Sequence, residues 1–234
     1  MPESISANLA VIAGRIQAAA ERSGRDEREV RLIAVSKTHP ADVLRSAIAS
    51  GISVFGENKV QEAESKVNEL GRGAAEWHLI GHLQSNKARK AVQLFDVIHS
   101  LDSVELAERL ERICIEEGRK ELPVLVQVDL AGEETKSGIT EEELPKMAEF
   151  LKGCERLKLK GLMVMPPFYD DPEATRPYFA RLRQLRDRLD ESGVFESGGE
   201  LSMGMSHDFE VAIEEGATMV RVGTAIFGAR EYPQ

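Results

Sequence analysis

Short apolar segments alternate with longer amphipathic segments along almost the whole chain. The short segments are rich in Val, Ile and Leu and are bounded by Gly, Pro or polar residues, which is typical of buried strands. The longer segments carry apolar residues at helical spacing, and a further one precedes the first strand, over residues 3–22. The eight segments that we expect to be strands are 31–37, 53–56, 77–81, 95–99, 124–128, 157–165, 201–205 and 219–222.

Eight strand–helix units in this order favour one particular α/β fold. Alternating strands and helices predict parallel strands joined by right-handed crossovers. Eight such units close naturally into a (β/α)8 TIM barrel, and 234 residues suit one such domain, which commonly takes about 250. An open doubly wound sheet is the alternative, although no G-x-G-x-x-G motif follows the first strand. We therefore expect a single barrel domain over residues 1–234 with an extra N-terminal helix.

The residues that follow the expected strand ends are mostly polar or small. In a barrel of this kind these positions converge on one mouth, where functional residues gather. They are Lys37, Glu57, Asn58, His82, Ser100, Asp129, Met165, Pro166, Ser206, Gly223 and Thr224. Several of them, together with Arg221, can serve one ligand.

Lys37 closes the first expected strand. Strand alternation places it on one face with Ile33 and Val35. Lysine is almost never fully buried unless it is paired, and a desolvated ammonium becomes a nucleophilic amine. Taken alone, this stretch favours a lysine that simply leaves the strand and reaches water. A place at the barrel mouth, opposite the loops after the last two strands and beside Arg221, instead favours a reactive amine.

The loops after the last two strands contain Ser206 and the pair Gly223-Thr224. Barrel phosphate sites are often built from these loops and from the N-terminus of a short helix. Glycine lets a phosphate approach the backbone, and free N–H groups at a helix start hold the anion. Ordinary N-capping of two helices by Ser206 and Thr224 is the alternative, but their combination favours a phosphate site.

Arg221 lies within the last expected strand, on the face of Met219 and Gly223. If Val220 and Val222 face the helices, Arg221 points into the barrel near the mouth. An interior arginine needs an acceptor. An ion pair with an acidic residue inside the barrel and a contact with a ligand both remain open.

An amine, a phosphate site and an inward arginine together suggest pyridoxal 5′-phosphate (PLP), held as a Schiff base. Lys37 would supply the imine nitrogen, and Ser206, Gly223 and Thr224 would hold the phosphate. Arg221 could donate to the pyridine nitrogen without protonating it, because guanidinium stays charged. Such an unprotonated ring is a weak electron sink. The alternative is a barrel whose lysine and phosphate loops serve another phosphorylated metabolite without an imine.

Composition narrows the range of partners. Forty acidic residues against 30 basic ones give a net charge of −10, which opposes non-specific binding to nucleic acid or anionic membranes. Cys114 and Cys154 fit neither a disulfide framework nor a metal-ligand spacing. We see no signal peptide and no apolar run of about 20 residues. We expect a cytoplasmic monomer with no bound metal and no nucleic-acid or membrane partner.

Several longer motifs resemble a known family. The sequence is similar to the pyridoxal-phosphate homeostasis proteins, which are single-domain relatives of the barrel domain of alanine racemase. The resemblance spans roughly the whole barrel. Its motifs are the stretches at 34–37, 55–58, 60–62, 78–87, 161–166, 201–206 and 220–228.

This resemblance implies a fold-type III PLP barrel with Lys37 as the cofactor lysine. It also implies a surrounding set of cofactor-binding residues, which are Asn58, Ser206, Arg221, Gly223 and Thr224. The implied function is to bind PLP and help control its free level and its delivery to PLP-requiring apoenzymes, without efficient turnover and without catalytic residues. Lys59 departs from the family, which usually has an aromatic residue there, so packing at the mouth stays open.

A PLP-dependent amino-acid racemase of low activity is the alternative function. Racemisation needs acid and base groups on both faces of the substrate carbon. In the racemases that the chain resembles, the second base is a Tyr from a separate C-terminal β domain, and we find no such segment after the last strand. Tyr169 is the only Tyr expected near the mouth, and we interpret it as loop packing.

Overall fold

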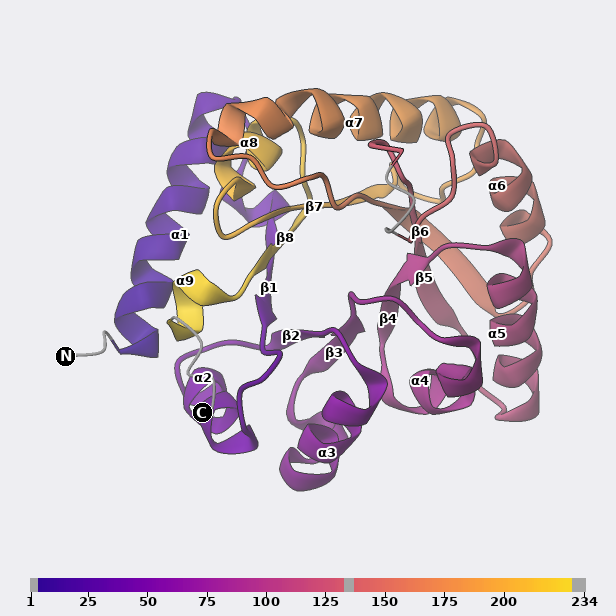
Figure 1. Ribbon diagram of the computed structural model, residues 1–234, viewed down its shortest axis with the longest axis horizontal. Helices are drawn as coiled ribbons and strands as arrows, with labels where there is room; N and C mark the ends of the chain where they lie inside the picture. The colour runs from indigo at the N-terminus through magenta and orange to yellow at the C-terminus, as the bar shows by residue number, and fades with distance from the viewer. Residues whose placement is uncertain (1–3, 133–136, 229–234) are drawn as a thin grey trace.

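Eight parallel strands form a closed barrel in the order β1 to β8, and helices surround it (Figure 1). The computed structural model describes residues 4–132 and 137–228. The strands are β1 (Arg31–Val35), β2 (Val54–Glu57), β3 (Glu76–Leu79), β4 (Val97–Leu101), β5 (Leu122–Gln127), β6 (Leu157–Met163), β7 (Glu200–Met205) and β8 (Met219–Val222). The predicted (β/α)8 barrel is therefore confirmed, and the open doubly wound sheet is wrong.

The helices alternate with the strands, and the first one precedes the barrel as predicted. They are α1 (Ile5–Arg22), α2 (Ala41–Ala49), α3 (Val60–Leu70), α4 (Ala88–Leu94), α5 (Val104–Glu116), α6 (Leu144–Lys152), α7 (Arg176–Glu191), α8 (Phe209–Glu214) and α9 (Thr224–Phe227). Short 3-10 turns are η1 (Glu27–Glu29), η2 (Arg72–Ala74), η3 (Ser85–Lys87) and η4 (Pro172–Thr175). No helix in this described part is long and apolar enough to cross a membrane.

Two strand boundaries differ from the prediction in ways that matter for the mouth. Strand β1 ends at Val35, because the chain turns at Thr38, whose φ of 69° is left-handed. Strand β4 begins at Val97 and not at residue 95, since the Phe95 N–H still caps helix α4 by donating to Ala91 O (2.9 Å). Ser100 therefore lies inside β4 rather than after it.

The apolar core has an outer and an inner part. The large outer cluster fills the space between strands and helices and includes stacked Phe55 and Trp77, whose ring centroids are 5.5 Å apart. Two small clusters lie on the opposite face of the strands, inside the barrel. They are Ile33 with Val54 and Met219, and Val97 with Leu125 and Met163. Cys114 is buried in the outer part and Cys154 is half-buried, and both are free thiols.

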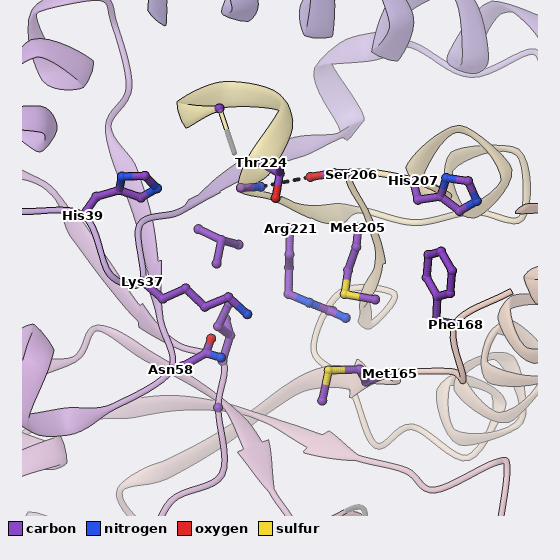
Figure 2. A pocket seen from close by; sticks show the side chains of 15 residues that line it. Lys37, His39, Asn58, Met165, Phe168, Met205, Ser206, His207, Arg221 and Thr224 are labelled. Atoms are coloured by element: carbon purple, nitrogen blue, oxygen red, sulfur yellow. Dashed lines mark hydrogen bonds between the residues drawn. The ribbon is translucent and has the colours of Figure 1, made fainter. Parts of the chain in front are cut away.

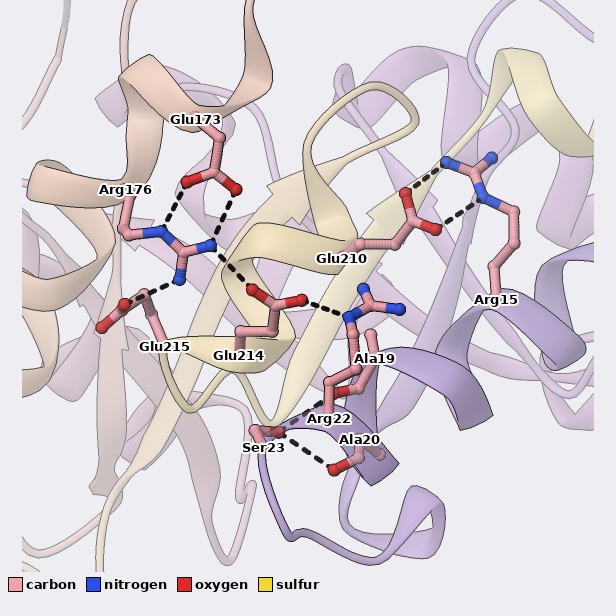
Figure 3. A network of polar contacts seen from close by, with 10 residues as sticks. All are labelled: Arg15, Ala19, Ala20, Arg22, Ser23, Glu173, Arg176, Glu210, Glu214 and Glu215. Atoms are coloured by element: carbon pink, nitrogen blue, oxygen red, sulfur yellow. Dashed lines mark hydrogen bonds and ion pairs between the residues drawn. The ribbon is translucent and has the colours of Figure 1, made fainter.

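Helix α1 packs against α8 and α9 and ties the two ends of the described chain together (Figure 1). Asn8 donates its side-chain amide to Ile226 O in α9 (2.9 Å). Arg15 pairs with Glu210 of α8 (2.8 Å), and in a separate network Glu214 of α8 pairs with Arg22 of α1 and Arg176 of α7 (2.7 Å each) (Figure 3). Partly exposed pairs of this kind stabilise by only about 0–1 kcal/mol each, so their main effect is to fix how α1 supports α8 and α9.

Candidate functional site

All six predicted site residues line one cavity at the mouth of the barrel (Figure 2). Its volume is about 280 Å³. The six are Lys37, Asn58, Ser206, Arg221, Gly223 and Thr224. Lys37 and Arg221 extend toward the centre of the cavity, whereas Ser206 and Thr224 lie together at one side (Figure 2). The structure therefore brings together the amine, the guanidinium and the two loops.

Several other predicted mouth residues do not line this cavity. Glu57 is fully buried on the other face of β2, and Ser100 donates its hydroxyl to Gly81 O (2.7 Å). His82 contacts Asp102 (2.9 Å), and Asp129 accepts hydrogen bonds from its own loop. These residues lie at or near the strand ends but do not contribute to the cavity lining, and for Glu57 the reason is strand alternation, which turns its side chain outward.

Lys37 lies in a turn, residues 36–39, and not in the strand itself. The turn closes when the His39 N–H donates to Ser36 O (3.1 Å). Thr38 takes the left-handed conformation, and its N–H donates to the Glu62 carboxylate. Val35 and Lys37 nevertheless line the same cavity, as strand alternation predicts. The structure thus places half-buried Lys37 in the wall of the cavity, while its role as a reactive amine stays a prediction.

A buried charged cluster holds this turn from behind. Lys66 of α3 donates to Ser36 O (2.7 Å), Glu57 Oε1 (2.6 Å) and Glu62 Oε1 (2.8 Å). The Ser36 hydroxyl also donates to Glu57 Oε1 (2.6 Å). Burial raises the pKa of Glu57, and Lys66 opposes that shift. This cluster was not predicted from the sequence, although the (i, i+4) spacing of Glu62 and Lys66 on a helix was a visible signal.

The two late loops form a cradle, which we define as Ser206, Gly223 and Thr224. The Gly223 N–H donates to Ser206 Oγ (3.2 Å), which joins the loops. Neither α8 nor α9 has a side-chain N-cap, since their N-cap residues are Asp208 and Gly223. N-capping by Ser206 and Thr224 is therefore wrong. The N–H groups of Ile226 and Phe227 donate to Gly223 O (2.8 and 3.0 Å), so the first two N–H groups of α9, those of Thr224 and Ala225, are the ones without an intrahelical acceptor.

A side chain at position 223 would be crowded. A Cβ there would lie 3.1 Å from Val35 O and 3.3 Å from Val35 Cβ. The loop thus passes directly against the end of β1, which brings the cradle beside the Lys37 turn. The cradle and the Lys37 amine, which come from opposite ends of the chain, therefore lie close together in this cavity.

Arg221 is buried on the inner face of β8, as predicted. Its guanidinium donates to Ser202 Oγ (2.7 Å) and to Val164 O (2.9 Å). Burial lowers its pKa to about 10, which leaves it charged at neutral pH. Within residues 4–132 and 137–228, no carboxylate lies within ion-pair distance of it. The predicted alternative of a direct ion pair inside the barrel is therefore wrong for this part of the chain.

An apolar and aromatic rim surrounds one side of the cavity, and of its residues only Met165 was expected at the mouth from the sequence. Met165, Phe168, Met205 and His207 line it, and Phe168 is 73% exposed (Figure 2). The Phe168 and His207 rings are 5.3 Å apart.

The predicted loop packing of Tyr169 agrees with its contacts. Its hydroxyl contacts that of Tyr178 at 2.8 Å, and its ring stacks on the same residue. Tyr169 is absent from the described lining of the cavity, so it is not placed to act there. Lys59 is exposed, precedes α3 and likewise does not contribute to that lining.

Comparison with known proteins agrees with this barrel and cavity. A family model for the N-terminal domain of alanine racemase matches residues 7–231. The pyridoxal phosphate homeostasis protein of Aquifex aeolicus is 45% identical over 225 residues, covering 96% of this chain and 97% of that protein. Its counterpart in Pseudomonas aeruginosa is 46% identical over 229 residues, covering 98% and 97%.

Solved structures show the same arrangement of strands. PipY of Synechococcus elongatus, solved with PLP bound, is 44% identical with a TM-score of 0.81, covering 93% of this chain and all of that chain. Alanine racemase of Corynebacterium glutamicum shares the fold at 18% identity, with a TM-score of 0.69, covering 95% of this chain and 62% of that one.

A closed parallel barrel with a lysine and the cradle at its mouth defines a class, and the chain belongs to the family of the alanine racemase N-terminal domain. Within that class it is a member of the pyridoxal phosphate homeostasis protein family. The membership predicted from the sequence motifs is thereby confirmed.

Proposed function

We propose that this chain binds PLP in the cavity and takes part in controlling the level of that cofactor. One observation carries the proposal: Lys37, the cradle and the buried Arg221 line the same cavity. Relatives named as pyridoxal phosphate homeostasis proteins and the PLP-bound PipY structure support it. The residues present fit the cofactor, because Gly223 leaves room beside Val35 that a Cβ would fill.

Each site residue has a separate task in this proposal. Lys37 supplies the amine that holds PLP as a Schiff base, while backbone N–H groups and hydroxyls of the cradle bind the phosphate. Arg221 donates to the pyridine nitrogen, and Asn58 lines the cavity beside Lys37 (Figure 2). Bound PLP supplies an electron sink, and a charged arginine at its nitrogen keeps that sink weak because it does not transfer its proton.

Storage and delivery of PLP, rather than turnover, follow from these tasks. Turnover by racemisation needs a second acid or base on the far face of the ligand. Tyr169, the tyrosine considered for that role, contacts Tyr178 instead. We therefore propose a cytoplasmic monomer in which one domain, residues 1–234, holds PLP and passes it to apoenzymes that require it.

A spectroscopic experiment tests the proposal. We expect purified protein to gain a visible absorbance band with added PLP, and borohydride to trap the cofactor on Lys37. Lys37→Ala should lose the band and the trapped adduct, whereas Lys59→Ala, which changes an exposed lysine outside the cavity, should keep both. A band that persists in Lys37→Ala refutes the assignment of Lys37. Fast, stereospecific racemisation of alanine by the purified protein contradicts a storage role.

A further inference from the structure

A line of buried polar side chains crosses the inside of the barrel and ends at Arg221. Glu76 Oε1 contacts His78 Nε2 (2.9 Å), and His78 Nδ1 contacts His99 Nε2 (2.8 Å). His99 Nδ1 contacts Ser202 Oγ (2.9 Å), which accepts from the Arg221 guanidinium (2.7 Å). His78, His99 and Ser202 have no exposed surface. We call these three residues the interior relay.

The relay lies on the inner face of strands whose other residues pack outward. Trp77 and Ile98, the neighbours of the two histidines, belong to the outer core. Two other parts of the inner face are apolar, namely the clusters around Ile33 and Val97. Buried polar groups are costly unless they are hydrogen-bonded, so a polar layer among apolar ones needs a reason beyond filling space.

The chemistry of the two ends gives the relay one direction. Arginine can only donate, so Ser202 Oγ is the acceptor in its contact with Arg221. The buried Ser202 hydroxyl then has His99 Nδ1 as its acceptor among the described side chains. With the Ser202 hydroxyl donating to His99 Nδ1, we assign the His99 proton to Nε2, which donates to His78 Nδ1. His78 in turn donates from Nε2 to the Glu76 carboxylate.

The surrounding charges agree with this assignment. Burial lowers the pKa of His99 well below its usual value, and His78 and Arg221 add to that effect, so His99 is neutral at pH 7. The hydrogen bond from His78 lowers the pKa of Glu76 and keeps its carboxylate ionised. Glu76 also pairs with Arg31 (3.1 Å). A charged donor at one end and a charged acceptor at the other polarise every bond in the same direction.

We propose that the interior relay positions Arg221, so that its guanidinium is held at a fixed place and angle beneath the ligand cavity. Ser202 holds one nitrogen and Val164 O holds the other, while His99 and His78 hold Ser202 in the accepting orientation. His78, His99 and Ser202 are thus positioning residues for the proposed cofactor. This role rests on the proposed function, because Arg221 is there assigned to the pyridine nitrogen.

The first test needs no cofactor. In protein labelled with ¹⁵N-histidine and free of PLP, NMR should show His78 and His99 as neutral rings that carry the proton on Nε2. Arg221→Leu removes the donor to Ser202 and should shift the ring-nitrogen signals of His99 more than those of exposed His82. A protonated His78, or a His99 that carries its proton on Nδ1, refutes the direction of the relay.

The second test measures the effect on PLP. Ser202→Ala leaves the Arg221 donor without its partner, and we expect PLP affinity to fall about tenfold and the visible band to shift in wavelength. Ser202→Thr keeps the hydroxyl and should restore both to within about twofold. Thr175→Ala is the matched control, because it removes a buried hydroxyl that bonds Pro172 O outside the cavity.

The outcomes separate the two proposals. Unchanged affinity and spectrum in folded Ser202→Ala, with a normal Lys37 adduct, refute the positioning role and leave the proposed function intact. If the wild-type protein does not bind PLP, the proposed function is refuted, while the histidine NMR signals still report on the relay. A folded Ser202→Thr that fails to recover the wild-type spectrum also contradicts positioning by the hydroxyl.

Discussion

The two sides of the cavity are held in place by different physical means. On the β1 side, Lys37 is carried by a turn that a buried charged cluster fixes, with Lys66 at its centre. On the β7–β8 side, the cradle is shaped by glycine backbone and by one hydroxyl, Ser206. Both sides reach the same cavity (Figure 2). The first side aims a long side chain, whereas the second presents backbone N–H groups.

These means suit the two tasks. A lysine side chain has four rotatable bonds, so a rigid turn beneath it limits where its amine can be. Buried ions give such rigidity because each one is costly unless all its partners stay in place. An anion site instead needs close approach to the backbone, which a glycine such as Gly223 leaves uncovered by a side chain. The β1 side should therefore be sensitive to loss of charge, and the cradle to added volume.

Removal of the central cation gives the largest expected effect. Lys66→Met leaves Glu57 as a buried, unpaired carboxylate, and breaking a buried pair costs about 3–5 kcal/mol. We expect the free energy of unfolding, measured in urea, to fall by about this amount. Lys90→Met is the matched control, because its pair with Glu64 is exposed and contributes about 0–1 kcal/mol.

A double variant identifies the cause. Lys66→Met combined with Glu57→Gln removes the stranded charge and keeps the hydrogen bond from Ser36 possible. The double variant should be more stable than Lys66→Met alone. Equal stability of the two proteins, or a Lys66→Met protein as stable as the wild type, contradicts the idea that buried charge holds the Lys37 turn.

Added volume at the cradle should give a smaller effect with a different signature. Gly223→Ala forces a Cβ to within 3.1 Å of Val35 O, and crowding of this kind costs about 1–3 kcal/mol. PLP affinity should fall along with stability, since the loop must move away from β1. Gly73→Ala is the control, because nothing lies within 4 Å of the position that its Cβ would occupy. Unchanged PLP affinity in Gly223→Ala contradicts a tight approach at this loop.

The two sides also differ in how far the sequence predicted them. The cradle was predicted because glycine and hydroxyl residues at strand ends carry a local signal in a barrel. The cluster behind Lys37 was missed, because Ser36, Glu57 and Lys66 come from separate elements that only the closed barrel brings together. Glu57 was placed at the mouth because a position at a strand end does not reveal which face is buried.

The barrel itself followed from the pattern of apolar segments, with errors confined to boundaries. The predicted start of strand β4 was two residues too early. Phe95 still caps helix α4, and the Asp96 side chain accepts from the Trp77 N–H, so the strand begins only at Val97. The interior relay was not predicted either. The sequence alone does not show which groups His78 and His99 hydrogen-bond, because their partners come from other strands of the barrel.

The smallest predicted effect concerns the support behind the cradle. Helix α1 holds α8 through Arg15 and Glu210, and Arg15 also lies over the Phe209 ring, 4.5 Å from its centre. The hydrogen bond from Arg15 lowers the pKa of Glu210 below its ordinary value of 4.5. The pair therefore stabilises the fold fully above pH 4.5, and this contribution is lost as the pH falls through the lowered pKa.

Glu210→Gln isolates this contribution. Because the pair is partly exposed and screened by salt, we expect a loss of only about 0.5 kcal/mol at pH 7. Urea unfolding of variant and wild type from pH 7 to pH 3 should show the difference shrinking toward zero at the acid end. A difference that stays constant over this range points to a packing role for Glu210. If Glu210→Gln lowers the free energy of unfolding as much as Lys66→Met does, the cradle side also depends on charge, and the proposed difference between the two sides of the cavity is wrong.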